Sequence, residues 1–279
     1  MNTMTAPQVA PVPLRIHHIE GRRSFRVAWL CEEIGLPYEL VFKRGDLMGS
    51  MVALRKAHPL CPITPAVEID GQTIVESGAI LDVLAARYAP GVMVPKVDSP
   101  DYPLHAQWMH FAEGTLMARI STDLFAAVAI GARLEDMPKG YRHGIDKPDV
   151  RAIMGTEQMF RFIEAYLGEH EYFGGSRFSA ADIMMQWSLR GARYAAQRRI
   201  ADYPNLARWH ERVESRPAYA RTVAAAVPDG MGEYMLPARE KMPFPPLMRG
   251  VAGVLARPIG ALLFWGLTRR QMLRRWFGY

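Results

Sequence analysis

The sequence predicts a mixed α/β domain followed by an all-helical domain. Two short strand candidates, residues 66–69 and 73–75, flank Asp70-Gly71, a dipeptide that favours a tight hairpin turn. Directly after this hairpin the pattern changes to helical spacing, with apolar residues at Ile80, Leu84 and Tyr88. Beyond a proline-rich segment, apolar residues recur at helical spacing only. The loss of strand-like segments beyond this point predicts that the α/β domain is followed by an all-helical domain.

Strands and helices alternate in the first domain. The predicted elements are a strand at 14–19, a helix at 24–34, a strand at 38–42, a helix at 47–57, hairpin strands at 66–69 and 73–75, and a helix from Ser77. The helix over 24–34 has Val27, Leu30 and Ile34 on one face and ends at Gly35. The predicted order is therefore βαβαββα.

Proline content sets the expected domain boundaries. Residues 90–103 contain four prolines and no helical period, so they are predicted to link the two domains. The α/β domain is then expected at 13–89 and the helical domain at 104–227. Residues 1–12, rich in Pro and Ala, are predicted to be disordered. Residues 228–279 form a basic and apolar extension.

Apolar spacing predicts two long helices in the second domain. The first is marked by Trp108, Phe111, Thr115 and Leu116, and the second by Ile153, Phe160, Ile163 and Leu167 with Gly168 at its end. Residues 137–147, between these helices, are predicted to form a loop.

A helix start at residues 178–183 is the strongest local signal of this domain. Ser179 is the predicted N-cap, and Asp182 occupies the third helical position, as in an acidic variant of the capping box. Phe178 and Ile183 lie at the two positions of a hydrophobic staple. This feature predicts a helix that begins after Ser179.

Composition excludes several classes of function. The net charge is +6, but residues 228–279 alone contain eight Lys or Arg and three Asp or Glu, so the rest of the chain is nearly neutral. No zinc-finger spacing or aromatic–basic motif indicates a nucleic-acid partner. Two distant cysteines, Cys31 and Cys61, fit a reducing compartment. The first residues lack the apolar run of a signal peptide, so a cytoplasmic location is expected.

Glu76 and Ser77 form a polar pair where a strand gives way to a helix. The N-terminus of a helix attracts an anion through its backbone N–H groups and its dipole. The Glu76 carboxylate attracts a cation at the same place. A ligand with a carboxylate and an ammonium group, as in the head of an α-amino acid, would match both. An ordinary helix cap is the alternative interpretation.

Three motifs resemble the cytosolic (bacterial-type) glutathione S-transferase family. They are Pro65 followed by the hairpin and ESGAI at 76–80, the SAAD sequence from Ser179, and YPNLARWHERVESRPAY at 203–219. The resemblance spans residues 14–225. It implies a thioredoxin-like α/β N-terminal domain plus an all-α C-terminal domain, with a cis Pro65. It also implies that Thr64 binds the cysteinyl part of glutathione through its backbone, and that Glu76 and Ser77 hold the γ-glutamyl end.

The catalytic position departs from the family pattern. The family stabilises the glutathione thiolate with a hydroxyl or a Cys after the first strand, and that position falls here at Gly21 or Arg22. Arg22 can replace the hydroxyl by its charge and its N–H groups. Ser24 is the nearest hydroxyl, and it can also be only a helix cap. In a third interpretation the peptide N–H groups near Ser24 act alone.

The segment before Pro65 departs as well. It is one residue longer than the family pattern and lacks the Gly-Lys pair near the glycyl carboxylate. His58, Lys43 and Lys56 are the candidates for that contact. Cys61 is either a redox thiol or, as the preferred interpretation, a small buried apolar residue. Cys31 lies on the apolar face of its helix and is expected in the core.

No metal site is expected from the sequence. His17 and His18 are adjacent in a strand and point to opposite faces, so they cannot readily share an ion. Trp108, Phe111 and Thr115 either line an apolar acceptor pocket or belong to the core. The tail contains Arg257-Pro258, which interrupts its apolar run. It is expected to pack on the second domain, or else to lie at a membrane surface.

The resemblance therefore predicts a glutathione transferase. Glutathione is the expected co-substrate, and its thiolate would attack an apolar or aromatic electrophile in conjugation, ether cleavage or dehalogenation. A homodimer is expected from the family. The alternative is a glutathione-binding or regulatory protein of the same fold without turnover, associated with a membrane through its tail. The missing hydroxyl is the reason to keep this alternative.

Overall fold

The computed structural model describes residues 14–120, 156–195 and 200–227. The predicted disordered N-terminus, the predicted loop at 137–147 and the tail from residue 228 lie outside these ranges. Ile153 lies outside them too. The predictions made for these segments therefore stay predictions.

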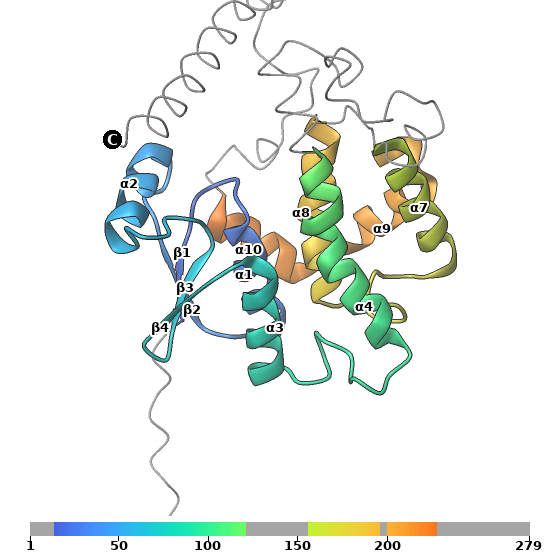
Figure 1. The fold of residues 1–279 in the computed structure, drawn as a ribbon, viewed down its shortest axis with the longest axis horizontal. Helices are drawn as coiled ribbons and strands as arrows, with labels where there is room; N and C mark the ends of the chain where they lie inside the picture. The colour runs from blue at the N-terminus through green and yellow to red at the C-terminus, as the bar shows by residue number, and fades with distance from the viewer. Residues whose placement is uncertain (1–13, 121–155, 196–199, 228–279) are drawn as a thin grey trace, which may run out of the picture. The chain divides into compact units, whose positions relative to one another are not determined.

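The N-terminal part contains a mixed four-stranded sheet (Figure 1). Its strands are β1 (Leu14–His17), β2 (Tyr38–Val41), β3 (Ala66–Ile69) and β4 (Gln72–Val75), in the order β2-β1-β3-β4. β1 is parallel to β2 and antiparallel to β3, and β3 is antiparallel to β4. Asp70 and Gly71 have positive φ values of 50° and 75°, which produce the hairpin turn predicted from their sequence.

Three helices complete the predicted βαβαββα order. They are α1 (Ser24–Ile34), α2 (Leu47–Ala57) and α3 (Ser77–Tyr88). α1 ends at Gly35, whose left-handed φ of 66° lets its N–H bond back to Cys31. The face of α1 that includes Val27 and Leu30 is fully buried. These elements confirm the thioredoxin-like arrangement.

The remaining described elements are all helical. They are α4 (Asp101–His110), a π-helical turn (Phe111–Met117), α7 (Thr156–Glu169), α8 (Ala180–Ala195), a 3₁₀ turn (Ile200–Asp202), α9 (Pro204–Glu214) and α10 (Pro217–Ala226). α4 begins at Asp101, inside the segment predicted as a linker. Pro103 fits there because a proline in the first helical turn removes an N–H that would have no partner within the helix.

The contacts divide the chain into two compact units. The first contains the described residues 14–109, 171–187 and 209–227, and the second contains 110–120, 156–170, 188–195 and 200–208. In the first unit, α1 packs against α3 and α10. The rings of Phe25 and Trp29 contact the ring of Tyr219 from α10. In the second unit, the ring of Phe160 on α7 contacts that of Tyr203, just before α9.

The capping box at the start of α8 is confirmed. The Ser179 N–H donates to the Asp182 carboxylate over 2.9 Å, and the Ser179 hydroxyl accepts from the Ala181 N–H. Asp182 is fully buried and also accepts from the Phe173 N–H and from Nε1 of Trp209. Burial, partly offset by these bonds, raises the pKa of Asp182 to about 6. The carboxylate therefore joins three segments of the first unit.

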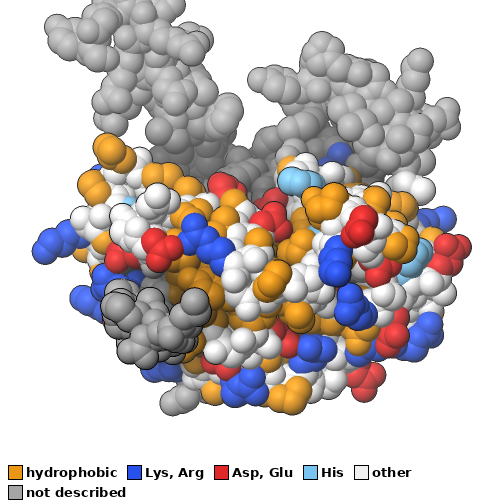
Figure 2. All heavy atoms as spheres, turned by 90° about the horizontal axis from the view of Figure 1, so that it is seen from below, with side chains coloured by type: hydrophobic (Ala, Val, Ile, Leu, Met, Phe, Trp, Pro, Cys, Tyr) orange, Lys and Arg blue, Asp and Glu red, His pale blue; other side chains and the backbone are white. Residues whose placement is uncertain are grey.

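Among the helices within the described ranges, none has the length and apolar character that a bilayer crossing requires. On the face drawn in Figure 2, the coloured Lys and Arg side chains are interspersed with Asp, Glu and hydrophobic side chains.

Candidate functional site

The loop that precedes β3 has the conformation that the resemblance implies. The Thr64–Pro65 peptide is cis, and Pro65 is buried. The Thr64 hydroxyl donates to the backbone carbonyl of His17 over 3.0 Å. This bond holds the loop against the end of β1, so the backbone of Thr64 occupies a fixed place beside the sheet.

Glu76 and Ser77 lie where β4 turns into α3. Glu76 has a φ of 73°, a left-handed value that few residues other than glycine adopt. Its side chain is exposed, whereas Ser77 is 3% exposed and opens α3. Exposed Glu76 therefore directly precedes Ser77 and the N–H groups that open α3, and these groups define the patch. This geometry suits a ligand with an ammonium group beside a carboxylate.

Arg26 holds Ser77 in place, a role that sequence reasoning missed. The Arg26 side chain comes from the first turn of α1 and is fully buried. Its Nη1 donates to the Ser77 hydroxyl over 2.9 Å, and its Nη2 donates to the carbonyl of Met184 over 2.8 Å. One guanidinium therefore connects α1, α3 and α8 beneath the patch. An Arg within an apolar helix stripe could have been noticed as unusual, but its partners are 51 and 158 residues away.

The loop after β1 presents Arg22 to solvent. Gly21 has a φ of 70°, and the Arg22 N–H donates to the Ile19 carbonyl over 3.1 Å. The Arg22 side chain is exposed, with a long contact of 3.4 Å to the Gly21 carbonyl. It can therefore turn toward a ligand without breaking a buried contact. Its predicted role in thiolate stabilisation stays a prediction.

The Ser24 hydroxyl is engaged inside the protein. Nε2 of His18 lies 2.7 Å from the carbonyl of Ala226, which can only accept, so this nitrogen carries a proton. Burial lowers the pKa of His18 to about 4, so at neutral pH the other nitrogen, Nδ1, is an acceptor. The Ser24 hydroxyl donates to it over 2.8 Å. The predicted catalytic role of Ser24 would require this proton to turn away from His18.

The two cysteines differ in environment. Cys31 is fully buried, as predicted, and burial raises its pKa. The preferred interpretation of Cys61 as a buried apolar residue is wrong, because Cys61 is exposed. It lies in the irregular connection between α2 and β3, where the apolar pattern that places residues in a core does not apply.

The candidates for the glycyl contact separate into two kinds. Lys43 and Lys56 are exposed. The ring of His58 instead packs edge-on against the ring of His17, with 4.4 Å between centroids, and its Nε2 faces Glu68. Trp108, a candidate for the acceptor pocket, is fully buried with its ring 4.7 Å from that of Phe173. Within the first unit Trp108 is therefore a core residue.

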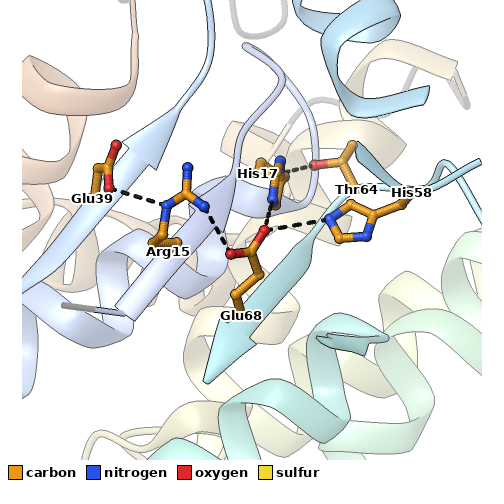
Figure 3. A network of polar contacts seen from close by, with 6 residues as sticks. All are labelled: Arg15, His17, Glu39, His58, Thr64 and Glu68. Atoms are coloured by element: carbon orange, nitrogen blue, oxygen red, sulfur yellow. Dashed lines mark hydrogen bonds and ion pairs between the residues drawn. The ribbon is translucent and has the colours of Figure 1, made fainter. Parts of the chain in front are cut away.

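Two histidines and a carboxylate converge where β1 pairs with β3 (Figure 3). Nε2 of His17 lies 2.7 Å from Oε1 of Glu68, and Nε2 of His58 lies 3.9 Å from the same oxygen. The other oxygen of Glu68 accepts from Arg15 over 2.8 Å. His17 and His18 point to different partners, as predicted. The grouping with His58 and Glu68 was missed because the three residues are distant in the sequence.

The fold and the patch define a protein with a thioredoxin-like domain, a cis-Pro loop, a Glu–Ser pair at a helix start and a following set of helices. Family models named "Glutathione S-transferase, N-terminal domain" and "Glutathione S-transferase, C-terminal domain" match residues 13–86 and 149–212. The chain is 33% identical over 224 residues to glutathione S-transferase 3 of Schizosaccharomyces pombe, covering 77% of this chain and 88% of that protein. The chain belongs to the glutathione S-transferase family.

Solved structures agree with this assignment. A glutathione S-transferase from Actinobacillus pleuropneumoniae superposes with a TM-score of 0.59 and 25% identity, over 76% of this chain and 92% of that one. The theta class glutathione S-transferase of the citrus canker pathogen Xanthomonas axonopodis pv. citri, solved with glutathione bound, gives a TM-score of 0.54 at 25% identity, over 76% and 98%.

Proposed function

We propose that this protein is a glutathione transferase in which the thiolate of glutathione attacks an apolar or aromatic electrophile. The observation that carries the proposal is the patch at the start of α3, where exposed Glu76 precedes buried Ser77 and where the pairing of Ala66 with Val75 brings the cis Thr64–Pro65 loop alongside. Family membership supports the same ligand. Conjugation, ether cleavage and dehalogenation are the reactions that such a thiolate can perform.

The patch assigns one role to each residue. The γ-glutamyl carboxylate accepts from the Ser77 hydroxyl and from N–H groups at the start of α3, and its ammonium group pairs with Glu76. The backbone N–H and carbonyl of Thr64 pair with the cysteinyl residue. The tripeptide is then held at its head and along its middle, which fixes where its sulfur lies.

The thiol must lose its proton before it attacks. Lowering a thiol pKa by about two units requires roughly 2.7 kcal/mol of preferential stabilisation of the anion. We assign this task to Arg22, whose guanidinium is exposed at the start of α1. The proton leaves to solvent, the sulfur forms a bond to the electrophilic carbon, and the leaving group departs with the electron pair.

Binding and turnover are tested separately. Calorimetry with glutathione should detect one site per chain, whereas cysteinylglycine, which lacks the γ-glutamyl head, should bind at least about tenfold more weakly because it loses the contacts to Glu76 and Ser77. A panel of aryl halides, benzylic halides and aryl ethers then tests turnover. Glutathione binding without turnover on the panel would support the alternative, a binding or regulatory protein of this fold. No binding of either peptide would remove both.

The glutathione S-transferase family also implies a homodimer. Sedimentation of the purified full chain at micromolar concentration should give twice the mass of one chain. A monomer that keeps full turnover would show that the site is complete within one chain.

A further inference from the structure

We infer that His17, His58 and Glu68 form a binding site for one divalent transition-metal ion, with Zn²⁺ as the probe of choice. The ligand atoms of the three side chains lie within 4.8 Å of one another. The residues come from β1, from the connection after α2 and from β3, as Figure 3 shows. The proposal does not depend on glutathione chemistry.

The two separations from Glu68 to the histidines are close to those of a tetrahedral zinc site. At Zn–N and Zn–O distances of about 2.0–2.2 Å, two ligands of a tetrahedral ion lie about 3.3 Å apart. The two measured separations from Oε1 of Glu68 are 2.7 Å to His17 and 3.9 Å to His58, which bracket this value. Small side-chain rotations would equalise them. The ion would take the place now held by the proton between His17 and Glu68.

One nitrogen of the cluster lacks a hydrogen-bond partner among the described residues. This nitrogen, Nε2 of His58, is shielded from solvent. Its nearest polar neighbour in the cluster is Oε1 of Glu68, at 3.9 Å, beyond hydrogen-bonding distance. A shielded imidazole nitrogen without a partner carries a free-energy cost. Coordination of an ion would remove this cost.

The surroundings supply the second shell that metal ligands require. Arg15 donates to Oε2 of Glu68 over 2.8 Å, which leaves Oε1 as the coordinating oxygen and fixes its orientation. The positive charge of Arg15 does not remove the negative charge of the site, because Arg15 also pairs with Glu39 over 3.2 Å. Glu39, Arg15 and Glu68 together carry a net charge of about −1 with ionised carboxylates. A divalent cation is therefore favoured electrostatically.

The ligand types select the ion and leave room for a further ligand. Two imidazoles and one carboxylate suit Zn²⁺ and related transition metals rather than Ca²⁺ or Mg²⁺, which prefer oxygen ligands. The side chain of Glu68 is 33% exposed, so a water ligand can approach the fourth position from the side of Glu68. A bound ion would tie His58, and with it the connection to Pro65, to two strands of the sheet.

The test uses the full chain without a polyhistidine tag and without glutathione. Titration calorimetry with Zn²⁺ should give one ion per chain, and His58→Gln should weaken binding at least about tenfold, since loss of even an outer-shell partner commonly costs 10–100-fold. Zn²⁺ should also slow amide hydrogen exchange at residues 58–64 in the wild type but not in the variant. This second measurement reports on the connection itself and is independent of enzymatic activity.

Two control variants separate this site from other zinc binding. His210→Gln breaks a histidine–glutamate pair on α9, at 3.0 Å from Glu214, and Cys61→Ser removes the exposed thiol three residues after His58. Both variants should bind Zn²⁺ as the wild type does. The inference is overturned if the wild type binds no stoichiometric ion, if His58→Gln binds as tightly as the wild type, or if only a control variant loses binding. Circular dichroism of each variant establishes that it is folded.

Discussion

The guanidinium of Arg26 donates to the Ser77 hydroxyl over 2.9 Å and so joins the first turn of α1 to the first residue of α3. Both side chains are buried, at 0% and 3% exposure. Ser77 therefore contributes to the fold through Arg26 and, in our proposal, to the ligand site through the same hydroxyl. The oxygen that would bind the γ-glutamyl carboxylate is positioned by a charged donor before any ligand arrives.

Replacing Arg26 by Met should destabilise the fold. The substitution removes two buried hydrogen bonds from a charged donor, to the Ser77 hydroxyl and to the Met184 carbonyl, and such bonds contribute about 1.5–3 kcal/mol each. We expect the free energy of unfolding in urea to fall by roughly 3 kcal/mol. Arg55→Met, at an exposed position of α2, is the matched control and should change stability by less than about 0.5 kcal/mol. Equal effects of the two substitutions would contradict the structural role of Arg26.

Ser77→Ala should weaken glutathione binding. A hydrogen bond to a charged group contributes about 1.5–3 kcal/mol, which corresponds to about 10- to 100-fold in the dissociation constant. Calorimetry measures this loss directly. Ser215→Ala, which removes a hydroxyl that donates to the Arg212 carbonyl in the turn after α9, should leave the affinity unchanged. An unchanged affinity in Ser77→Ala would remove Ser77 from the ligand site.

Arg22→Ala should raise the pKa of the bound glutathione thiol. Loss of a guanidinium beside the sulfur removes charge stabilisation of the thiolate, and a rise of about one unit corresponds to about 1.4 kcal/mol. The pH dependence of thiolate absorbance in the complex gives this pKa. Arg177→Ala, another exposed arginine outside the loop after β1, should leave the thiol pKa unchanged. If both variants titrate like the wild type, Arg22 is removed, and Ser24 and the backbone N–H groups remain as candidates for stabilising the thiolate.

Ser24→Ala tests whether Ser24, the second catalytic candidate, stabilises the thiolate or only the loop after β1. The Ser24 hydroxyl donates to His18 and accepts from the Ile19 N–H over 3.3 Å, so its removal should affect the loop rather than the sulfur. We expect a loss of about 1 kcal/mol in unfolding free energy and an unchanged thiol pKa. A rise in the thiol pKa without loss of stability would instead establish Ser24 as the activating hydroxyl.

Stability should fall as the pH decreases from about 6.5 toward 4. Burial holds the pKa of His18 at about 4 in the folded protein, below the ordinary histidine value of 6.5. The unfolded chain therefore binds the proton more readily in this range, and acid favours unfolding. Protonation of His18 across this whole range should lower the free energy of unfolding by an amount on the order of 3 kcal/mol. Denaturant unfolding of the wild type and of His18→Asn at several pH values measures it.

The expected result is a smaller loss of stability with acid in His18→Asn than in the wild type. His105 is also buried, with its pKa lowered to about 4 by burial, and titrates in the same range. The variant should therefore keep part of the pH dependence. Identical pH profiles for the two proteins would show that His18 does not titrate on unfolding.

Local sequence patterns were sufficient to predict the positions of α1, α2 and the capping box of α8. α1 and α2 have the bounds that the sequence predicts, because Gly35, Asp46 and the apolar spacing act within one or two turns. The Ser179–Asp182 capping box is a contact between neighbours in the sequence and was predicted for the same reason. The cis Thr64–Pro65 peptide, Glu76 and Ser77 came from the family motif rather than from any local physical pattern.

The sequence by itself determined the order of strands and helices, the position of the patch at the start of α3 and the family, since these depend on spacing along the chain. Only the tertiary structure brought Arg26 to Ser77, turned the Ser24 hydroxyl to His18, exposed Cys61 and grouped His17 with His58 and Glu68. Each of these contacts depends on the folded paths of segments between them or, for Cys61, on packing around an irregular connection. Local spacing fixes which face a residue occupies on its own element, but packing decides what that face meets.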